Sequence, residues 1–240
     1  MKLVILLAGV GSRLRPLTDV RPKCLVEVGG RTILERFLTQ AKATEAFEEV
    51  VLVTGYRQEQ IAEFATAWSQ EHGLKVSFVH NARYDETNNG YTLLCAHEEL
   101  ANGFVLTDGD LILEEGILSR VAGLSHSGLA VDMQMKLDEE AMKFVLDEQG
   151  HVTELSKEIT VERGLGESIG LCKIVAEDVP AIVAHLAQLV EAGEENEYYE
   201  RAFQERIREG WQLGVVDVGD LRWVEVDDHA DLARAERIFG

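Results

Sequence analysis

The segment LVILLAGVGSRLRPLTDVRPKCLVEVGG, residues 3–30, decides how the rest of the chain is interpreted. Its apolar start, residues 3–7, predicts a short buried strand, and Gly9 and Gly11 end that strand in a loop. Glycine lets backbone N–H groups turn toward an anion because no Cβ atom is in the way. The loop also carries five side chains that can donate hydrogen bonds: Ser12, Arg13, Arg15, Arg21 and Lys23. The segment therefore predicts a phosphate-binding loop.

Positive charge is concentrated in the same part of the chain. Residues 1–36 contain seven Lys and Arg against three Asp and Glu, whereas all 240 residues together have a net charge of −20. A chain this acidic repels nucleic acids and anionic membranes, so we expect neither as a partner. A small anionic ligand at the basic loop remains compatible with this distribution.

The glycines do not fit two common nucleotide-binding motifs. GVGSRL has Leu14 where the dinucleotide-binding pattern needs a third glycine, and no GK[ST] follows as in a P-loop. The longer string is more specific: LAGVGSRLRPLT followed by RPKCLVEVGGR resembles the signature of the nucleotidyltransferases that activate sugar phosphates and related phosphate monoesters. The resemblance implies that the loop wraps a triphosphate and that Lys23 and Arg13 are the catalytic cations. It also implies a set of nucleotide-binding residues, namely Leu7, Ala8, Gly9, Gly11, Ser12, Arg13, Lys23, Gly55, Tyr56 and Asn88.

Composition predicts one soluble domain spanning residues 1–240. The chain has three prolines, no linker-like stretch and no internal repeat. Cys24, Cys95 and Cys172 are far apart and form no CxxC pair, which favours a reducing cytoplasm over a disulfide scaffold or a zinc site. The apolar start VILLAG is too short for a signal peptide or a membrane span. We therefore expect a cytoplasmic protein.

Strands and helices alternate through the first hundred residues, which predicts an α/β fold with ligands at the carboxyl ends of parallel strands. The expected strands are 3–7, 50–53, 76–79 and 104–110. The expected helices are 32–42, which Thr32 should cap, 58–70, 92–100, 179–189 and 195–209. From residue 129 the pattern indicates antiparallel strands, with a hairpin around the sequence EQG. Together with the resemblance, this predicts a Rossmann-like nucleotidyltransferase fold with a mixed, mainly parallel sheet flanked by helices.

Two acidic pairs are candidates for a divalent cation, because residues two apart in an extended chain face one side. The first is Asp108 with Asp110, and the resemblance selects Asp110. The second is Glu225 with Asp227, whose WVEVD element matches the one that supplies the second metal carboxylate in related enzymes. The resemblance implies Mg²⁺ as the cofactor, held by Asp110, Glu225 and Asp227. Asp228 should instead cap the last helix.

The segments expected to bind the acceptor, which is the phosphate monoester that receives the nucleotidyl group, resemble one branch of the family. DEEAMKFVLDEQGHVTELSKEI and GESIGLCKI are similar to the phosphocholine cytidylyltransferases and their relatives, which implies CTP as the nucleotide and phosphocholine as the first-choice acceptor. The substrate-binding residues expected on this basis are Asn89, Tyr91, Lys157, Glu167, Ser168, Tyr199 and Glu200. Tyr198 and Tyr199 cannot share a helix face, so one should be in the core while the other meets the cleft. Gly90 stands where many relatives have a bulky residue, which predicts more room and keeps inositol 1-phosphate, phosphonate and sugar 1-phosphate acceptors open.

Together, these residues predict an enzyme that transfers a nucleotidyl group to its acceptor and releases pyrophosphate. A phosphate monoester with a second pKa of about 6 is mostly a dianion at neutral pH, so its attack on the nucleotide needs no general base. The alternative is a protein without catalytic activity, namely a regulatory subunit that senses a nucleotide without turning it over. The sequence leaves the oligomeric state open, a homodimer included.

Overall fold

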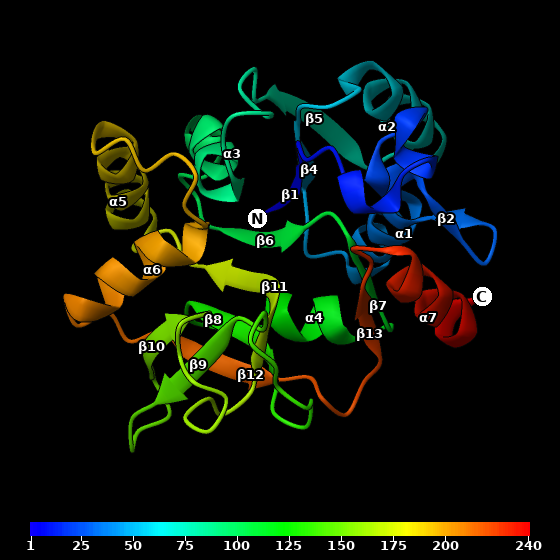
Figure 1. Cartoon of the computed structure of the whole chain (residues 1–240). Helices are drawn as coiled ribbons and strands as arrows, with labels where there is room; N and C mark the ends of the chain where they lie inside the picture. The colour runs from blue at the N-terminus through cyan, green and yellow to red at the C-terminus, as the bar shows by residue number, and fades with distance from the viewer.

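A computed structural model describes residues 1–240, and its parallel strands form the centre of the fold (Figure 1). β1 lies between β6 and β4, and β5 follows at the edge. These four parallel strands are β1 (Lys2–Leu7), β4 (Glu49–Thr54), β5 (Lys75–His80) and β6 (Phe104–Asp108). Because parallel strands end at the same edge, Leu7, Thr54 and Asp108 bring their following loops together there.

The second half of the sheet is largely antiparallel. β11 pairs antiparallel with β6 and β8, and β12 pairs parallel with β8 at the end of this half. These five strands are β8 (Gly128–Asp132), β9 (Lys143–Leu146), β10 (Val152–Ser156), β11 (Glu167–Ile174) and β12 (Gly214–Asp217). The predicted mixed sheet and the EQG hairpin, formed by β9 and β10, are both confirmed.

Two short ribbons lie outside this sheet. One pairs β2 (Glu27–Val28) with β3 (Arg31–Thr32) directly after the basic loop. The other pairs β7 (Leu111–Leu113) with β13 (Trp223–Glu225), so the C-terminal strand lies beside the segment that follows β6.

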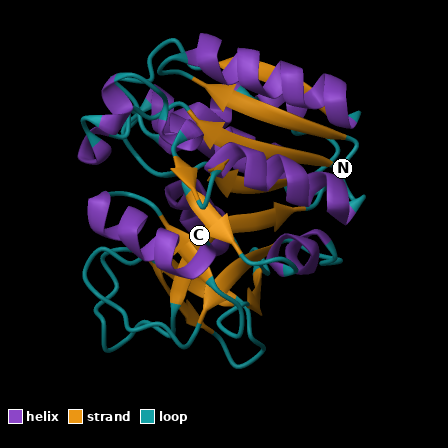
Figure 2. Ribbon diagram, turned by 90° about the vertical axis from the view of Figure 1, so that its right-hand side faces the viewer, coloured by secondary structure: helices purple, strands orange, loops and turns teal.

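Helices cover both faces of the sheet, as Figure 2 shows. The helices that contribute to the core on one face of the sheet are α1 (Ile33–Thr44), α2 (Gln58–His72), α4 (Ile117–Ala122) and α7 (His229–Phe239). The helices that contribute to the core on the other face are α3 (Asn89–Cys95), α5 (Val179–Glu191) and α6 (Tyr199–Arg208). None of these helices is both long enough and apolar enough to span a bilayer.

The apolar run of β1 follows from burial on both of these faces. Leu3, Ile5 and Leu7 belong to one core cluster, whereas Val4 and Leu6 belong to the other. Successive side chains of a strand point to opposite faces, so a central parallel strand needs apolar residues at every position.

Two of the predicted helices had wrong boundaries. The helix expected at residues 92–100 begins at Asn89, because the side chain of Asn88 accepts a hydrogen bond from the Asn89 backbone, and it ends at Cys95. The helix expected at residues 195–209 begins only at Tyr199. The carbonyl groups of residues 195 and 196 accept hydrogen bonds from Asn88 instead of continuing a helix. The predicted helix caps at Thr32 and Asp228 are confirmed.

Candidate active site

A cavity of about 420 Å³ opens at the carboxyl edge of the parallel strands. Its lining brings together both ends of the chain and the antiparallel half. The predicted nucleotide and metal residues that line it are Leu7, Ala8, Gly9, Gly11, Ser12, Arg13, Lys23, Asn88, Asp110, Glu225 and Asp227. The predicted acceptor residues that line it are Asn89, Lys157, Glu167, Ser168 and Glu200.

The basic loop is folded tightly around Gly11. Gly11 has φ of 65°, in the left-handed region, and a Cβ atom there would lie 3.0 Å from Cβ of Lys23. Thr18 closes the turn by donating from its hydroxyl group to the Gly11 carbonyl at 2.8 Å. The glycine therefore serves to bring Lys23 under the loop, in addition to exposing backbone N–H groups.

Gly55 and Tyr56, two of the predicted nucleotide-binding residues, do not line this cavity. Both lie behind the loop. The Tyr56 backbone donates to the Ala8 carbonyl at 3.0 Å, and its hydroxyl group donates to the Thr18 carbonyl at 2.8 Å. A Cβ atom on Gly55 would lie 2.5 Å from Tyr84 and 2.7 Å from the Ala8 oxygen. These two residues support the loop from its far side.

Lys23 connects the predicted metal ligands. Its ammonium group donates to Oδ2 of Asp110 at 2.8 Å and to Oδ1 of Asp227 at 2.6 Å. Arg13 pairs with the other oxygen of Asp227 at 2.5 Å. Burial by itself lowers the pKa of Lys23, but the negative charges of Asp110 and Asp227 outweigh burial and raise it. Lys23 is thus a fixed cation.

Three carboxyl groups lie close together beside these two cations. Oxygen atoms of Asp110, Glu225 and Asp227 all lie within 4.8 Å of one another. Burial, then the charges of Asp110 and Asp227, raises the pKa of Glu225. Burial also opposes ionisation of Asp227, but Lys23 and Arg13 hold its pKa below the usual value.

These residues fit a hard divalent cation. Oδ1 of Asp110 is buried without a hydrogen-bond partner, and an unpaired buried oxygen is costly unless a ligand or cation satisfies it. Carboxylate oxygens are the ligands that Mg²⁺ prefers. Asp110, Glu225 and Asp227 would hold it, at the boundary between the basic loop and the rest of the cavity.

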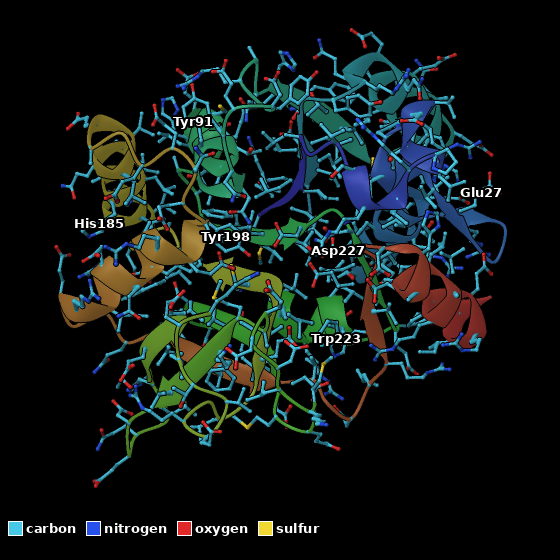
Figure 3. The ribbon with its side chains drawn as sticks, in the orientation of Figure 1. Glu27, Tyr91, His185, Tyr198, Trp223 and Asp227 are labelled. Carbon is cyan, nitrogen blue, oxygen red and sulfur yellow. The ribbon has the colours of Figure 1, made fainter.

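On the acceptor side, one tyrosine faces the cavity and the other lies in the core, as expected, but Tyr199, which was expected to bind the substrate, is the one in the core. Tyr198 lines the cavity with 39% of its surface exposed, whereas Tyr199 is 2% exposed and packs in the core. The hydroxyl group of Tyr199 donates to Oδ2 of Asp108 at 3.2 Å, behind the cavity wall. Tyr91 also lies off the cavity, with the Arg83 guanidinium over its ring. Figure 3 shows Tyr198 where α6 begins and Asp227 between β13 and α7.

Gly90 does not enlarge the cavity, contrary to the sequence prediction. A Cβ atom there would lie 2.7 Å from the Glu197 carbonyl and 3.3 Å from the Tyr199 nitrogen. The glycine therefore lets α3 approach the first turn of α6. That turn carries Tyr198 and Glu200 into the cavity.

Several lining residues were not among the predicted site residues. They lie in loops and within β11 and reach the cavity only through tertiary folding: Tyr84, Thr87, Glu140, Met142, Ile169 and Gly170. Asp108 and Tyr198 were weighed as candidates and line the cavity too. The position of Tyr84 could have been found, because it follows β5 at the edge where β1 and β6 also end.

Known proteins resemble this chain in both sequence and fold. The family model described as the MobA-like NTP transferase domain matches residues 3–151. The chain belongs to this family. The predicted family resemblance is therefore confirmed, as is the fold class.

The curated relatives of this family member include a CMP-phosphonate synthase, two cytidylyltransferases and several proteins named bifunctional protein GlmU. The CMP-5'-(3-aminopropyl)phosphonate synthase of Streptomyces rubellomurinus is 28% identical, in a match that covers 100% of this chain and 39% of that protein. The choline-phosphate cytidylyltransferase of Streptococcus pneumoniae is 35% identical over 44% of this chain and 43% of that protein. The CTP:phosphoglutamine cytidylyltransferase of Campylobacter jejuni is 25% identical over 97% of this chain and 98% of that protein. The chain thus spans less than half of the first two relatives.

Solved structures agree with the fold along the whole chain. The CTP:phosphocholine cytidylyltransferase of Streptococcus pneumoniae has a TM-score of 0.79 at 25% identity, covering 100% of this chain and 99% of that chain. The inositol-1-phosphate CTP transferase of T. maritima has a TM-score of 0.78 at 20% identity, covering 100% and 97%. At that identity the second likeness shows the fold alone.

Proposed function

We propose that this protein is a Mg²⁺-dependent cytidylyltransferase that transfers CMP from CTP to a small phosphate-bearing acceptor and releases pyrophosphate. The observation that carries the proposal is the position of Lys23, held by Asp110 and Asp227 in the lining of a cavity that also includes the basic loop and the first turn of α6. The proposed preference for CTP is supported by the names of three relatives, a CMP-phosphonate synthase and two cytidylyltransferases.

The residues of the basic loop would act on the triphosphate. In the reaction an acceptor oxygen bonds to the α-phosphorus while the bond from that phosphorus to the pyrophosphate oxygen breaks. Negative charge grows on the leaving pyrophosphate, and Lys23, Arg13 and the loop N–H groups would stabilise it. Mg²⁺ bound by Asp110, Glu225 and Asp227 would supply further charge neutralisation on the phosphates.

No residue needs to remove a proton from the acceptor. Its phosphate is already largely a dianion at neutral pH, so the protein has to hold the two substrates in line. Lys157, on the acceptor side of the cavity, would bind this phosphate. Its ammonium group lies 3.7 Å from Glu140 and 5.0 Å from the ring centre of Tyr198.

The acceptor side favours a head group with a positively charged nitrogen. Four carboxyl groups and one lysine line this side: Asp108, Glu140, Glu167, Glu200 and Lys157. A neutral sugar or inositol would offer these carboxyl groups no positively charged partner. Phosphocholine, the first choice from sequence, belongs to the favoured class, and inositol 1-phosphate and sugar 1-phosphates are the alternatives.

The test is pyrophosphate release, measured with four nucleoside triphosphates and a panel of phosphate monoesters and phosphonates. We expect turnover to be fastest with CTP and to require both Mg²⁺ and an amine-bearing acceptor. CTP binding without pyrophosphate release from any acceptor would favour the nucleotide-sensing alternative. A clear preference for a neutral acceptor would contradict the cationic head group but not nucleotidyl transfer.

A further inference from the structure

Glu200 is a buried carboxylate that takes no part in the transfer of the nucleotidyl group itself. It lies in the first turn of α6, lines the cavity and is 6% exposed. Its Oε2 atom is buried and has no hydrogen-bond partner. An unpartnered carboxylate oxygen in such a place is unfavourable unless a ligand satisfies it.

The other carboxylates on the acceptor side differ from Glu200 in their partners. Asp108 accepts hydrogen bonds from Tyr199 at 3.2 Å and from Asn89 at 3.4 Å. Glu140 reaches into solvent and pairs with Lys157. Glu167 remains, half-buried, and the charge of Lys157 acts on both Glu167 and Glu200. Two carboxylates near Lys157 are thus available to a cationic ligand.

The aromatic lining of the cavity is too sparse for a quaternary ammonium group. Such a group has no N–H donor and is recognised by several ring faces around it. Only Tyr84 and Tyr198 line the cavity among the aromatic residues. Tyr84 lies beside Gly55, next to the nucleotide loop, and the ammonium group of Lys157 lies over the ring of Tyr198. An ammonium with N–H donors matches carboxylates instead, through charge-assisted hydrogen bonds.

We propose that Glu200, with Glu167 as second carboxylate, selects acceptors whose head group is a primary ammonium over those with a quaternary ammonium. The inference rests on the proposed function and narrows its acceptor class. It moves phosphoethanolamine and aminoalkylphosphonates ahead of phosphocholine. Burial raises the pKa of Glu200 to about 7, so an incoming ammonium group replaces a proton as its partner.

The experiment is a methylation series with CTP and Mg²⁺ fixed. The acceptors are phosphoethanolamine, its N-methyl and N,N-dimethyl derivatives, and phosphocholine, which share one phosphate and differ in the number of N–H donors. We expect kcat/KM to fall at each step, by roughly tenfold or more overall. A higher kcat/KM for phosphocholine than for phosphoethanolamine would overturn the proposal.

Two variants assign this preference to Glu200. In Glu200→Gln, the ratio of kcat/KM for phosphoethanolamine to that for phosphocholine should drop at least tenfold. Glu205→Gln is the matched control, because Glu205 lies on the same helix but pairs with Arg201 and Arg208 away from the cavity. An unchanged ratio in Glu200→Gln, or an equal drop in Glu205→Gln, would contradict the assignment.

Failure of the proposed function can be told apart from failure of this inference. If no acceptor releases pyrophosphate from CTP, the proposed function is wrong. Calorimetric binding of phosphoethanolamine and phosphocholine to the wild-type protein then still tests the preference. Tighter binding of phosphoethanolamine supports the inference, and equal or weaker binding overturns it.

Discussion

At the scale of single residues, the position of Lys23 in the cavity lining gives its ammonium group two roles. It neutralises Asp110 and Asp227 within the protein, and it faces the space where charge would grow on pyrophosphate. A cation with a fixed place needs no reorganisation as that charge develops, which is the basis of electrostatic catalysis.

Removing this cation should reduce turnover without unfolding the protein. We expect Lys23→Ala to lower kcat by roughly 10²-fold or more, as for other lost charge stabilisers. The measurement is steady-state pyrophosphate release, with circular dichroism to confirm folding. Arg31→Ala, an exposed cation outside the cavity, is the control and should keep its rate. A folded Lys23→Ala variant within threefold of wild type would show that the role is misassigned.

Ionised Glu200 should lower the free energy of unfolding of the unliganded protein at high pH. Its ordinary pKa of 4.5 applies to the unfolded chain, and burial raises the native value to about 7. The native state therefore binds the proton more tightly, so the free energy of unfolding falls as pH rises from about 4.5 to about 7 and stays lower above it. The groups that act on Glu200 are Asp108, Tyr199 and Lys157.

Glu200→Gln removes this dependence. At pH 8 the variant should be more stable than wild type by roughly 1–3 kcal/mol, and the difference should shrink toward pH 5. Urea denaturation of the unliganded proteins at the two pH values measures it. If the variant were less stable than wild type at pH 8, Glu200 would be a structural residue.

At the scale of elements, the sequence predicted what local rules determine. The apolar run of β1, the cap at Thr32 and the hairpin around EQG each depend on neighbours in the chain, and the structure contains all three. The start of α6 was wrong because it depends on distant contacts. Asn88 holds residues 195 and 196 out of the helix, and no pattern within 195–209 encodes that contact.

The contact between α3 and α6 gives an element-scale prediction. A Cβ atom on Gly90 would collide with the backbone of residues 197–199, which carries Tyr198 and Glu200. We expect Gly90→Ala to raise KM for the acceptor about tenfold or more while KM for CTP changes little. Gly123→Ala is the control, since its added methyl group would lie no closer than 3.3 Å to other atoms and far from the cavity. Equal increases in both KM values would mean that the glycine supports the whole cavity.

At the scale of the whole molecule, the candidate metal site joins the two ends of the chain. Arg13 and Lys23 precede the first helix, whereas Asp227 follows β13, and the hydrogen bond from Arg13 to Asp227 connects residues 214 positions apart. The sequence motifs predicted the members of this cluster. Their convergence depends on the pairing of β13 with β7, which only the folded chain shows.

Mg²⁺ should therefore stabilise the whole fold by binding the native cluster and not the dispersed unfolded residues. At about ten times its dissociation constant, a bound ion adds about 1.4 kcal/mol, or a rise in Tm of about 3–6 °C for a domain of this size. Asp227→Asn keeps the size of the side chain but removes its charge, so it should lose most of this rise. Asp228→Asn is the matched control, because asparagine can still cap α7 as Asp228 does. Differential scanning calorimetry with and without Mg²⁺ measures both shifts. Equal shifts in the two variants would mean that Asp227 is not a ligand, and no shift in wild type would mean that the cluster binds no metal without nucleotide.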